Sequence, residues 1–453
     1  MEKYNDLDKR SEKIFQIIVN IIAGISSFYY LLKIGQPLND APLIHSIILI
    51  IFAIKFIMDL FIFKIGYASF SLLLLFLPVI SILGYGPIGE VQPLFNDSTL
   101  LIEKHFYILA FAALFFYYVW SSLLYVNKKS FLLYDAEALK KLFGNSHSLL
   151  STWFFSLLAI AASIIYLPDL PGKAYHDLSE SLLPGNAWNS VVVVSYFFVL
   201  VGVKGSMIRK LALFFVPFWL LTHYARVDIL GLVLLMYLII TTAKKGKAFK
   251  PKVNFRKIGI LVIGILVFSY LGLVRHSGLV FDTEAILNSL GILINYPTVQ
   301  DLIYSTAAAI EVNHQSGNYY TLINYIPQLM PSFFGQGIDA APHIVASEIH
   351  TNYGLLVYGE YYLNYRILGL FLAPFVTYAV VFLPAYLLKR GFGNLGFTLG
   401  YYLILTTTPR IMWYGYIYYL KPLVMIVPVF LLLHLIITNI EKEITVNPAV
   451  KYK

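Results

Sequence analysis

Apolar runs of about 20 residues recur along this chain, and each is long enough to cross the hydrocarbon core of a bilayer as a helix. A helix satisfies its own backbone hydrogen bonds, which lipid cannot do, so such runs are expected to be helical. With 59% hydrophobic and only 13% charged residues, the chain lies outside the range of soluble globular domains. We predict an all-α, polytopic integral membrane protein with about twelve spans, near 14–33, 43–64, 66–84, 105–126, 150–168, 187–203, 211–225, 227–243, 258–274, 366–388, 395–416 and 420–440.

The distribution of lysine and arginine predicts the orientation of these spans. If the N-terminus is cytoplasmic, 24 of the 33 basic residues fall in cytoplasmic segments, seven of them in KKGKAFKPKVNFRK (244–257). The opposite orientation would place all 24 outside, against the positive-inside rule. Both termini are therefore predicted to be cytoplasmic. The first apolar run is too long for a cleaved signal peptide, and we expect it to be retained as a span.

One long segment, 275–365, is predicted to lie on the far side of the membrane. Loops of this length are usually functional, and we expect short helices at 340–350 and 353–365. The chain then divides into N-terminal spans (1–210), three further spans (211–274), the large loop (275–365), and the last spans with a cytoplasmic tail (366–453).

Composition excludes several classes of function. The chain has no cysteine, so neither disulfides nor thiolate metal sites are available. Its net charge of +9 is explained by membrane orientation, and no nucleic-acid partner is implied. No metal-ligand spacing such as HExxH and no glycine-rich phosphate loop occurs, so we expect chemistry without a metal or cofactor.

Nine basic residues remain on or near the non-cytoplasmic side after orientation is explained. Arg226, Arg275 and Arg410 among them are predicted to share one depth near that interface, where a common anionic partner such as a lipid pyrophosphate would suit their guanidinium groups. Pairing with a local carboxylate or with lipid phosphate is the alternative, and Asp228 is such a partner for Arg226. The nine are Lys33, Lys55, Lys104, Lys173, Arg226, Arg275, Arg366, Arg410 and Lys421.

Lys55 and Asp59 lie four residues apart on the second predicted span. They would share a helix face, and a structural ion pair is favoured over a proton relay.

The stretch HTNYGLLVYGEYYLNY (350–365) concentrates polar and aromatic residues before an apolar run. On a helix, Tyr353, Leu356, Glu360 and Asn364 would share one side and form a stripe able to face a cavity. Tyr353, Tyr361 and Asn364 could bind sugar by stacking and hydrogen bonding. An interfacial aromatic belt is the alternative for the tyrosines. His350 and Glu360 are the candidate general bases, because either can accept a proton from a hydroxyl; His276 and His343 are weaker candidates.

Five motifs in 215–420 together resemble the Wzy-type O-antigen polymerases, most closely the branch that polymerises enterobacterial common antigen. They are HYARVDIL, LGLVRHSG, NYIPQLMPSFFG, HTNYGLLVYGEYYLNYRILG and TTTPRIMWYG, in this order. The resemblance implies a GT-C-like glycosyltransferase in the bacterial inner membrane, with its active face in the periplasm. It also implies that Arg226, Arg275 and Arg410 bind pyrophosphate, and that a chain-length regulator and a flippase are partners.

The expected reaction transfers a growing glycan from undecaprenyl pyrophosphate to the incoming lipid-linked repeat unit, with inversion at the anomeric carbon. An O-antigen ligase, which transfers to lipid A core, and a flippase for lipid-linked oligosaccharide are the competing interpretations. A flippase would be expected to carry charges deep in several spans, whereas here they gather near one interface.

Overall fold

The computed structural model describes residues 2–38, 42–63, 66–85, 98–127, 148–165, 186–222, 231–235, 297–323, 329, 341–351 and 354–446. Within these ranges every regular element is a helix and none is a strand. Among the described residues, six helical segments are long and apolar enough to cross a membrane: Ile14–Lys33, Pro42–Phe63, Tyr67–Gly84, Phe106–Val126, Val357–Tyr414 and Ile417–Thr445. The predicted fold class, an all-helical membrane protein, is confirmed at this level, and the count of twelve spans stays a prediction.

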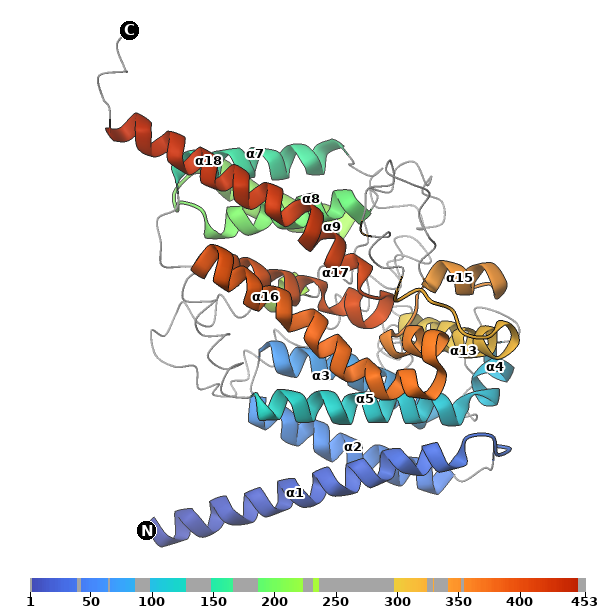
Figure 1. Ribbon diagram of the computed structural model, residues 1–453. Coiled ribbons are helices and arrows are strands. Elements are labelled where there is room, and N and C mark those ends of the chain that lie inside the picture. Colours follow the sequence, from blue (N-terminus) through green and yellow to red (C-terminus); the bar gives the residue numbers. More distant parts are fainter. Residues whose placement is uncertain are drawn as a thin grey trace, which may run out of the picture.

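The helices form two groups with the C-terminal helices between and beside them (Figure 1). The first group holds α1 (Glu2–Lys33), α2 (Pro42–Phe63), α3 (Tyr67–Tyr85) and α5 (Phe106–Val126). The second holds α7 (Leu149–Ile165), α8 (Asn186–Val201) and α9 (Met207–Thr222). Helix α16 (Val357–Tyr414) packs on α3 and α5, while α18 (Val427–Val446) packs on α7 and α8.

Burial separates central from peripheral helices in the first group. About four-fifths of the apolar window of α5 is buried, 83%, against 28% for α2. Large apolar side chains such as Leu32, Leu43 and Phe61 are exposed on α1 and α2. Exposed large apolar side chains along these helices suit contact with lipid chains. The periphery of the molecule thus supports the membrane assignment independently of hydropathy.

Two backbone reversals divide α16 into three helical stretches. Arg366 (φ 53°) and Gly393 (φ 58°) have non-helical conformations, so the stretches run over 357–365, 367–392 and 394–414. Glycine adopts positive φ at little cost, which explains the turn at Gly393, whereas at Arg366 the backbone is strained. The second and third stretches correspond to the predicted spans 366–388 and 395–416.

Two further predicted spans are represented by shorter described helices, and two lie largely outside the described residues. The apolar helices Leu149–Ile165 and Ser190–Val201 occupy the predicted spans 150–168 and 187–203. Of the predicted spans 227–243 and 258–274, only 231–235 is described. Helix α9 covers most of the predicted span 211–225.

The large predicted loop contains more helix than the sequence indicated. Helix α13 (Pro297–Ser316) was not predicted, whereas α15 (Ala341–Glu348) and the first stretch of α16 confirm the two short helices expected there. With α4 (Ser98–Lys104), these elements gather at one end of the molecule, which we call the distal end because the start of α1 and the end of α18 lie at the other (Figure 1). The π-helical turn η5 (Pro422–Ile426) follows α17 (Ile417–Lys421) and leads into α18.

Candidate functional site

Five of the eight predicted site residues lie in the described part of the chain, all at or near the distal end. His350 follows α15, Glu360, Tyr361 and Asn364 lie on the first stretch of α16, and Arg410 lies near the end of its third stretch. Arg226, Arg275 and Tyr353 lie outside the described residues.

Two segments about 50 residues apart in sequence meet at this end. The backbone N–H of Leu355 donates to the carbonyl of Trp413 at 3.0 Å. The hydroxyl of Tyr416 donates to that of Tyr361 at 2.9 Å and also bonds Thr377. The third stretch of α16 therefore returns to the segment that precedes its first stretch, and brings the end of the helix beside its beginning.

Arg410 lies one turn before Tyr414, within this junction. Its side chain is partly buried, and the guanidinium lies over the ring of Tyr418 at 5.1 Å from the centroid. Stacking on an aromatic face leaves the N–H groups at the rim of the guanidinium able to donate hydrogen bonds. Such an arginine can bind an anion without giving up its aromatic contact.

Glu360 and Asn364 are buried and bonded to protein groups. The amide of Asn364 donates to the Thr321 hydroxyl at 2.8 Å and to the Glu360 carbonyl at 2.7 Å, and its oxygen accepts from the N–H of Leu322 at 3.2 Å. The Thr321 hydroxyl also lies 3.5 Å from the Glu360 carboxylate. These contacts attach the start of α16 to residues 321–322, and the predicted roles of this stripe in binding sugar stay predictions.

The two candidate general bases have different surroundings. Glu360 is 2% exposed, whereas His350 is an exposed residue just beyond α15. A general base must come within hydrogen-bonding distance of the proton that it removes. Accessibility therefore favours His350 over Glu360 for chemistry on a substrate that approaches the distal surface.

A cluster of charged and titratable residues, which we call the distal cluster, was not predicted from the sequence. It consists of Lys104, His105, Glu311 and His314. The Glu311 carboxylate accepts from the Lys104 ammonium at 2.7 Å and contacts His105 Nε2 at 2.8 Å. The rings of His105 and His314 lie 5.2 Å apart, nearly perpendicular.

Hydrogen bonding and burial set the protonation of the distal cluster. Burial alone would raise the pKa of Glu311, but hydrogen bonds from Lys104, His105 and Gln315 outweigh it and bring the pKa to about 2. Burial lowers the pKa of His105 and of His314, which the attraction of Glu311 only partly offsets. At neutral pH the cluster therefore holds a carboxylate beside neutral imidazoles.

A local signal for half of this cluster was present in the sequence. Glu311 and His314 form a Glu-x-x-His pattern, which places both side chains on one face of α13. His105 lies more than 200 positions earlier, at the junction of α4 and α5. Only packing of α4 against α13 completes the group.

Asn313 joins α13 to the strained residue of α16. Its amide donates to the carbonyl of Leu363 at 2.8 Å, and its oxygen accepts from Arg366 Nε at 2.9 Å. The hydroxyl of Tyr362 lies 2.8 Å from His314 Nε2. These bonds hold Arg366 in its uncommon backbone conformation and fix the start of α16 against the distal cluster.

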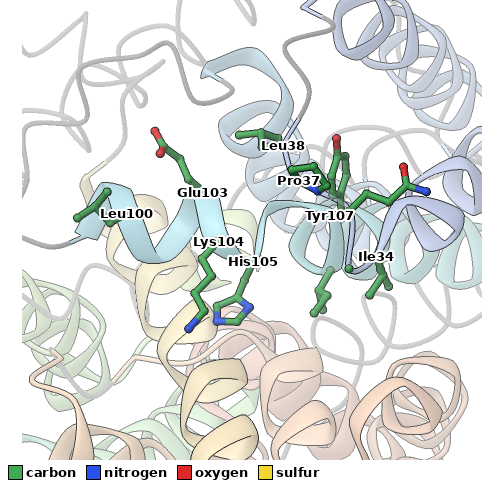
Figure 2. Close-up of a pocket in the computed structure, with 11 residues that line it drawn as sticks. Ile34, Pro37, Leu38, Leu100, Glu103, Lys104, His105 and Tyr107 are labelled. Atoms are coloured by element: carbon green, nitrogen blue, oxygen red, sulfur yellow. The ribbon is translucent and has the colours of Figure 1, made fainter.

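A pocket of about 480 Å³ lies beside the distal cluster, between the segment that follows α1 and the α4–α5 junction. Figure 2 shows Leu38, Pro37 and Tyr107 on one side and Leu100 and Glu103 on another, while Lys104 and His105 point away toward neighbouring helices. The pocket therefore shares its wall with the cluster, although the charged ends of Lys104 and His105 are engaged with Glu311.

No protein-family model, no curated protein and no solved structure matches this chain.

Proposed function

We propose that this protein is a membrane glycosyltransferase that polymerises undecaprenyl-pyrophosphate-linked oligosaccharide repeat units at its distal end. The observation that supports the proposal is the junction of two of the motifs that resemble the polymerases. Gly354–Asn364 and Pro409–Tyr418 pack on each other there, with the Arg410 guanidinium over Tyr418. A cation that lies beside aromatic and hydroxyl groups, at the end of a helical bundle, suits a lipid-linked, anionic sugar substrate.

In the proposed reaction, a hydroxyl of the acceptor's terminal sugar attacks the anomeric carbon of the donor glycan. The new glycosidic bond forms as the bond to pyrophosphate breaks, and His350 or Glu360 takes the hydroxyl proton. The electron pair of the broken bond leaves on undecaprenyl pyrophosphate, whose charge Arg410, with Arg226 and Arg275, would stabilise. A single displacement inverts the anomeric configuration.

The proposed location is the bacterial inner membrane, with both termini cytoplasmic and the distal end in the periplasm. The lysines and arginines of the cytoplasmic segments supply the argument for this orientation. The start of α1 and the end of α18 lie on the same side of the molecule (Figure 1), which is consistent with this proposal. A chain-length regulator and a flippase are the protein partners that this role implies.

The ligase reaction has the same chemistry with lipid A core as acceptor, so the acceptor must be determined in the host. We would delete the gene, separate the surface glycolipids on a gel, and complement with wild type, Arg275→Ala and Arg410→Ala. Removing one group that stabilises transition-state charge typically lowers turnover by roughly 100–1,000-fold. The deletion is expected to reduce a ladder to one repeat unit, and neither variant should restore it.

Arg390→Ala is the matched control for Arg410→Ala. Arg390 is also stacked on a tyrosine, with its guanidinium 4.9 Å from the ring of Tyr386, but it lies at the far end of the second stretch of α16. It should restore the full ladder. Wild-type ladders from both Arg275→Ala and Arg410→Ala would exclude the proposed site. If the deletion strain instead accumulated full-length polymer on undecaprenyl pyrophosphate, the protein would be a ligase. If it lost all surface glycan without accumulating such polymer, the protein would be a flippase.

A further inference from the structure

The distal cluster has the composition and geometry of a metal site. His105, Glu311 and His314 each offer one ligand atom, and these three atoms lie within 4.8 Å of one another. Small rotations of the side chains would bring all three to the roughly 2.0–2.2 Å at which zinc binds imidazole nitrogen and carboxylate oxygen. We propose that these three residues bind a divalent metal ion of the zinc class. The proposal is independent of the glycosyltransferase assignment.

The donor set favours zinc over the hard divalent cations. Two imidazoles and one carboxylate form a recurring three-ligand zinc set that leaves a fourth position for water, whereas Ca²⁺ and Mg²⁺ prefer oxygen ligands. Neither His105 nor Glu311 is open to solvent: the side chain of His105 is 3% exposed and that of Glu311 is 11% exposed. His314, the third ligand, is exposed, so two shielded ligands and one solvent-facing ligand would hold the ion.

Tyr362 orients one of the three ligands. Its hydroxyl lies 2.8 Å from Nε2 of His314, which leaves Nδ1 of this ring for the metal. Metal-bound histidines usually use their second nitrogen in a hydrogen bond of this kind, which fixes the ring. A metal bound here would connect the α4–α5 junction, which carries His105, to α13, which carries Glu311 and His314. The hydrogen bond with Tyr362 would add support from α16.

Lys104 competes with the metal for Glu311. Its ammonium lies 2.7 Å from the same carboxylate oxygen that contacts His105. The Lys104 side chain is 58% exposed, so it can turn into solvent when a cation replaces it. The metal would then carry the positive charge that Lys104 now supplies. Removal of this lysine should strengthen metal binding, whereas a purely structural ion pair predicts no such effect.

The test is a zinc titration of the full chain, purified in detergent without a polyhistidine tag and stripped with a chelator. Competition with a chromophoric zinc indicator should give one high-affinity ion per chain, and Co²⁺ should give the visible absorption of a low-symmetry site. Glu311→Gln and His314→Ala should each weaken binding at least as much as the roughly 10–100-fold that loss of an outer hydrogen-bonding partner causes. His343→Ala, which removes an exposed histidine of α15, is the control and should bind as wild type does.

Lys104→Met keeps the test informative if a ligand variant fails to fold. It leaves all three ligands in place, and we expect zinc affinity to rise because the competing ammonium is gone. Wild-type affinity in both Glu311→Gln and His314→Ala would overturn the proposal, since the ion would then be held elsewhere. Absence of stoichiometric binding in both the wild type and Lys104→Met would overturn it as well.

Discussion

Two clusters of charged residues in the described part of the chain differ in how far they are exposed to solvent. In the buried cluster, the Lys55 ammonium donates to Asn20 and Ser121 at 2.8 Å each and pairs with Asp59 at 3.2 Å. Asp59 in turn accepts from Ser121 at 2.8 Å and from Tyr117 at 3.1 Å. In the distal cluster, the Glu311 carboxylate accepts from Lys104, His105 and Gln315, but the lysine is exposed.

Exposure separates the clusters further. The side chains of Lys55 and Asp59 are 3% and 6% exposed, whereas that of Lys104 is 58% exposed. The buried cluster uses its donors and acceptors inside the protein and connects α1, α2 and α5, as a structural ion pair does. The distal cluster can exchange one of its charges with an external ion. Similar residue types thus serve stability in one place and are available for binding in the other.

The largest effect is expected from Asp59→Ala, which leaves the Lys55 ammonium buried without its counter-ion. Breaking one side of a buried pair typically costs about 3–5 kcal/mol. Unfolding of the purified protein in mixed detergent micelles would measure the loss of stability. The double variant Lys55→Met, Asp59→Leu is the control and should recover most of it, because no charge is then buried. A small loss in Asp59→Ala would remove the distinction between the clusters.

Glu311→Gln should have an intermediate effect. It retains the size of the side chain but removes the charge that Lys104 and His105 contact, and hydrogen bonds to charged groups contribute about 1.5–3 kcal/mol. Partial exposure reduces this, so we expect a loss of about 1–2 kcal/mol in the same unfolding measurement. A loss as large as that of Asp59→Ala would mean that the distal cluster, too, is primarily structural.

Lys104→Met should change stability least, in the absence of added zinc. Pairs with an exposed partner contribute about 0–1 kcal/mol, since water screens the charges and ordering the side chain costs entropy. The unfolding free energy, measured with chelator present, should lie within about 1 kcal/mol of wild type. A larger loss would show that the metal-free protein needs Lys104 to neutralise Glu311. That result would argue against replacement of the Lys104 ammonium by a metal ion.

The comparison also shows which clusters can be found from sequence. Lys55 and Asp59 are four residues apart on one helix, so helical periodicity predicted their ion pair, and the structure confirms it. Glu311 lies 206 residues from His105, and no local pattern connects them. Their contact depends on how α4 and α5 pack against α13.

Hydropathy predicted each described helix that is long and apolar enough to span the membrane, but it did not predict α13, which is not one of these spans. Its sequence, PTVQDLIYSTAAAIEVNHQS, mixes polar and apolar residues, so it carries no spanning signal. Yet Ala307, Ala308 and Ala309 are fully buried, since tertiary packing and not composition decides their environment. The backbone reversal at Arg366 could not be predicted from the sequence either. Arginine rarely adopts positive φ, so its tertiary contacts, and not its own conformational preference, hold this backbone geometry.

The sequence by itself determined that this chain is a helical membrane protein, and it predicted an orientation, because apolar length and the distribution of basic residues act through the bilayer and need no tertiary contact. It also marked His350, Glu360 and Arg410 as candidates. Only the tertiary structure decided that Glu360 is buried while His350 is exposed, that the two ends of α16 meet, and that His105 joins Glu311 and His314. Those features depend on helix packing between distant segments, and a one-dimensional pattern does not encode such packing in a readable form.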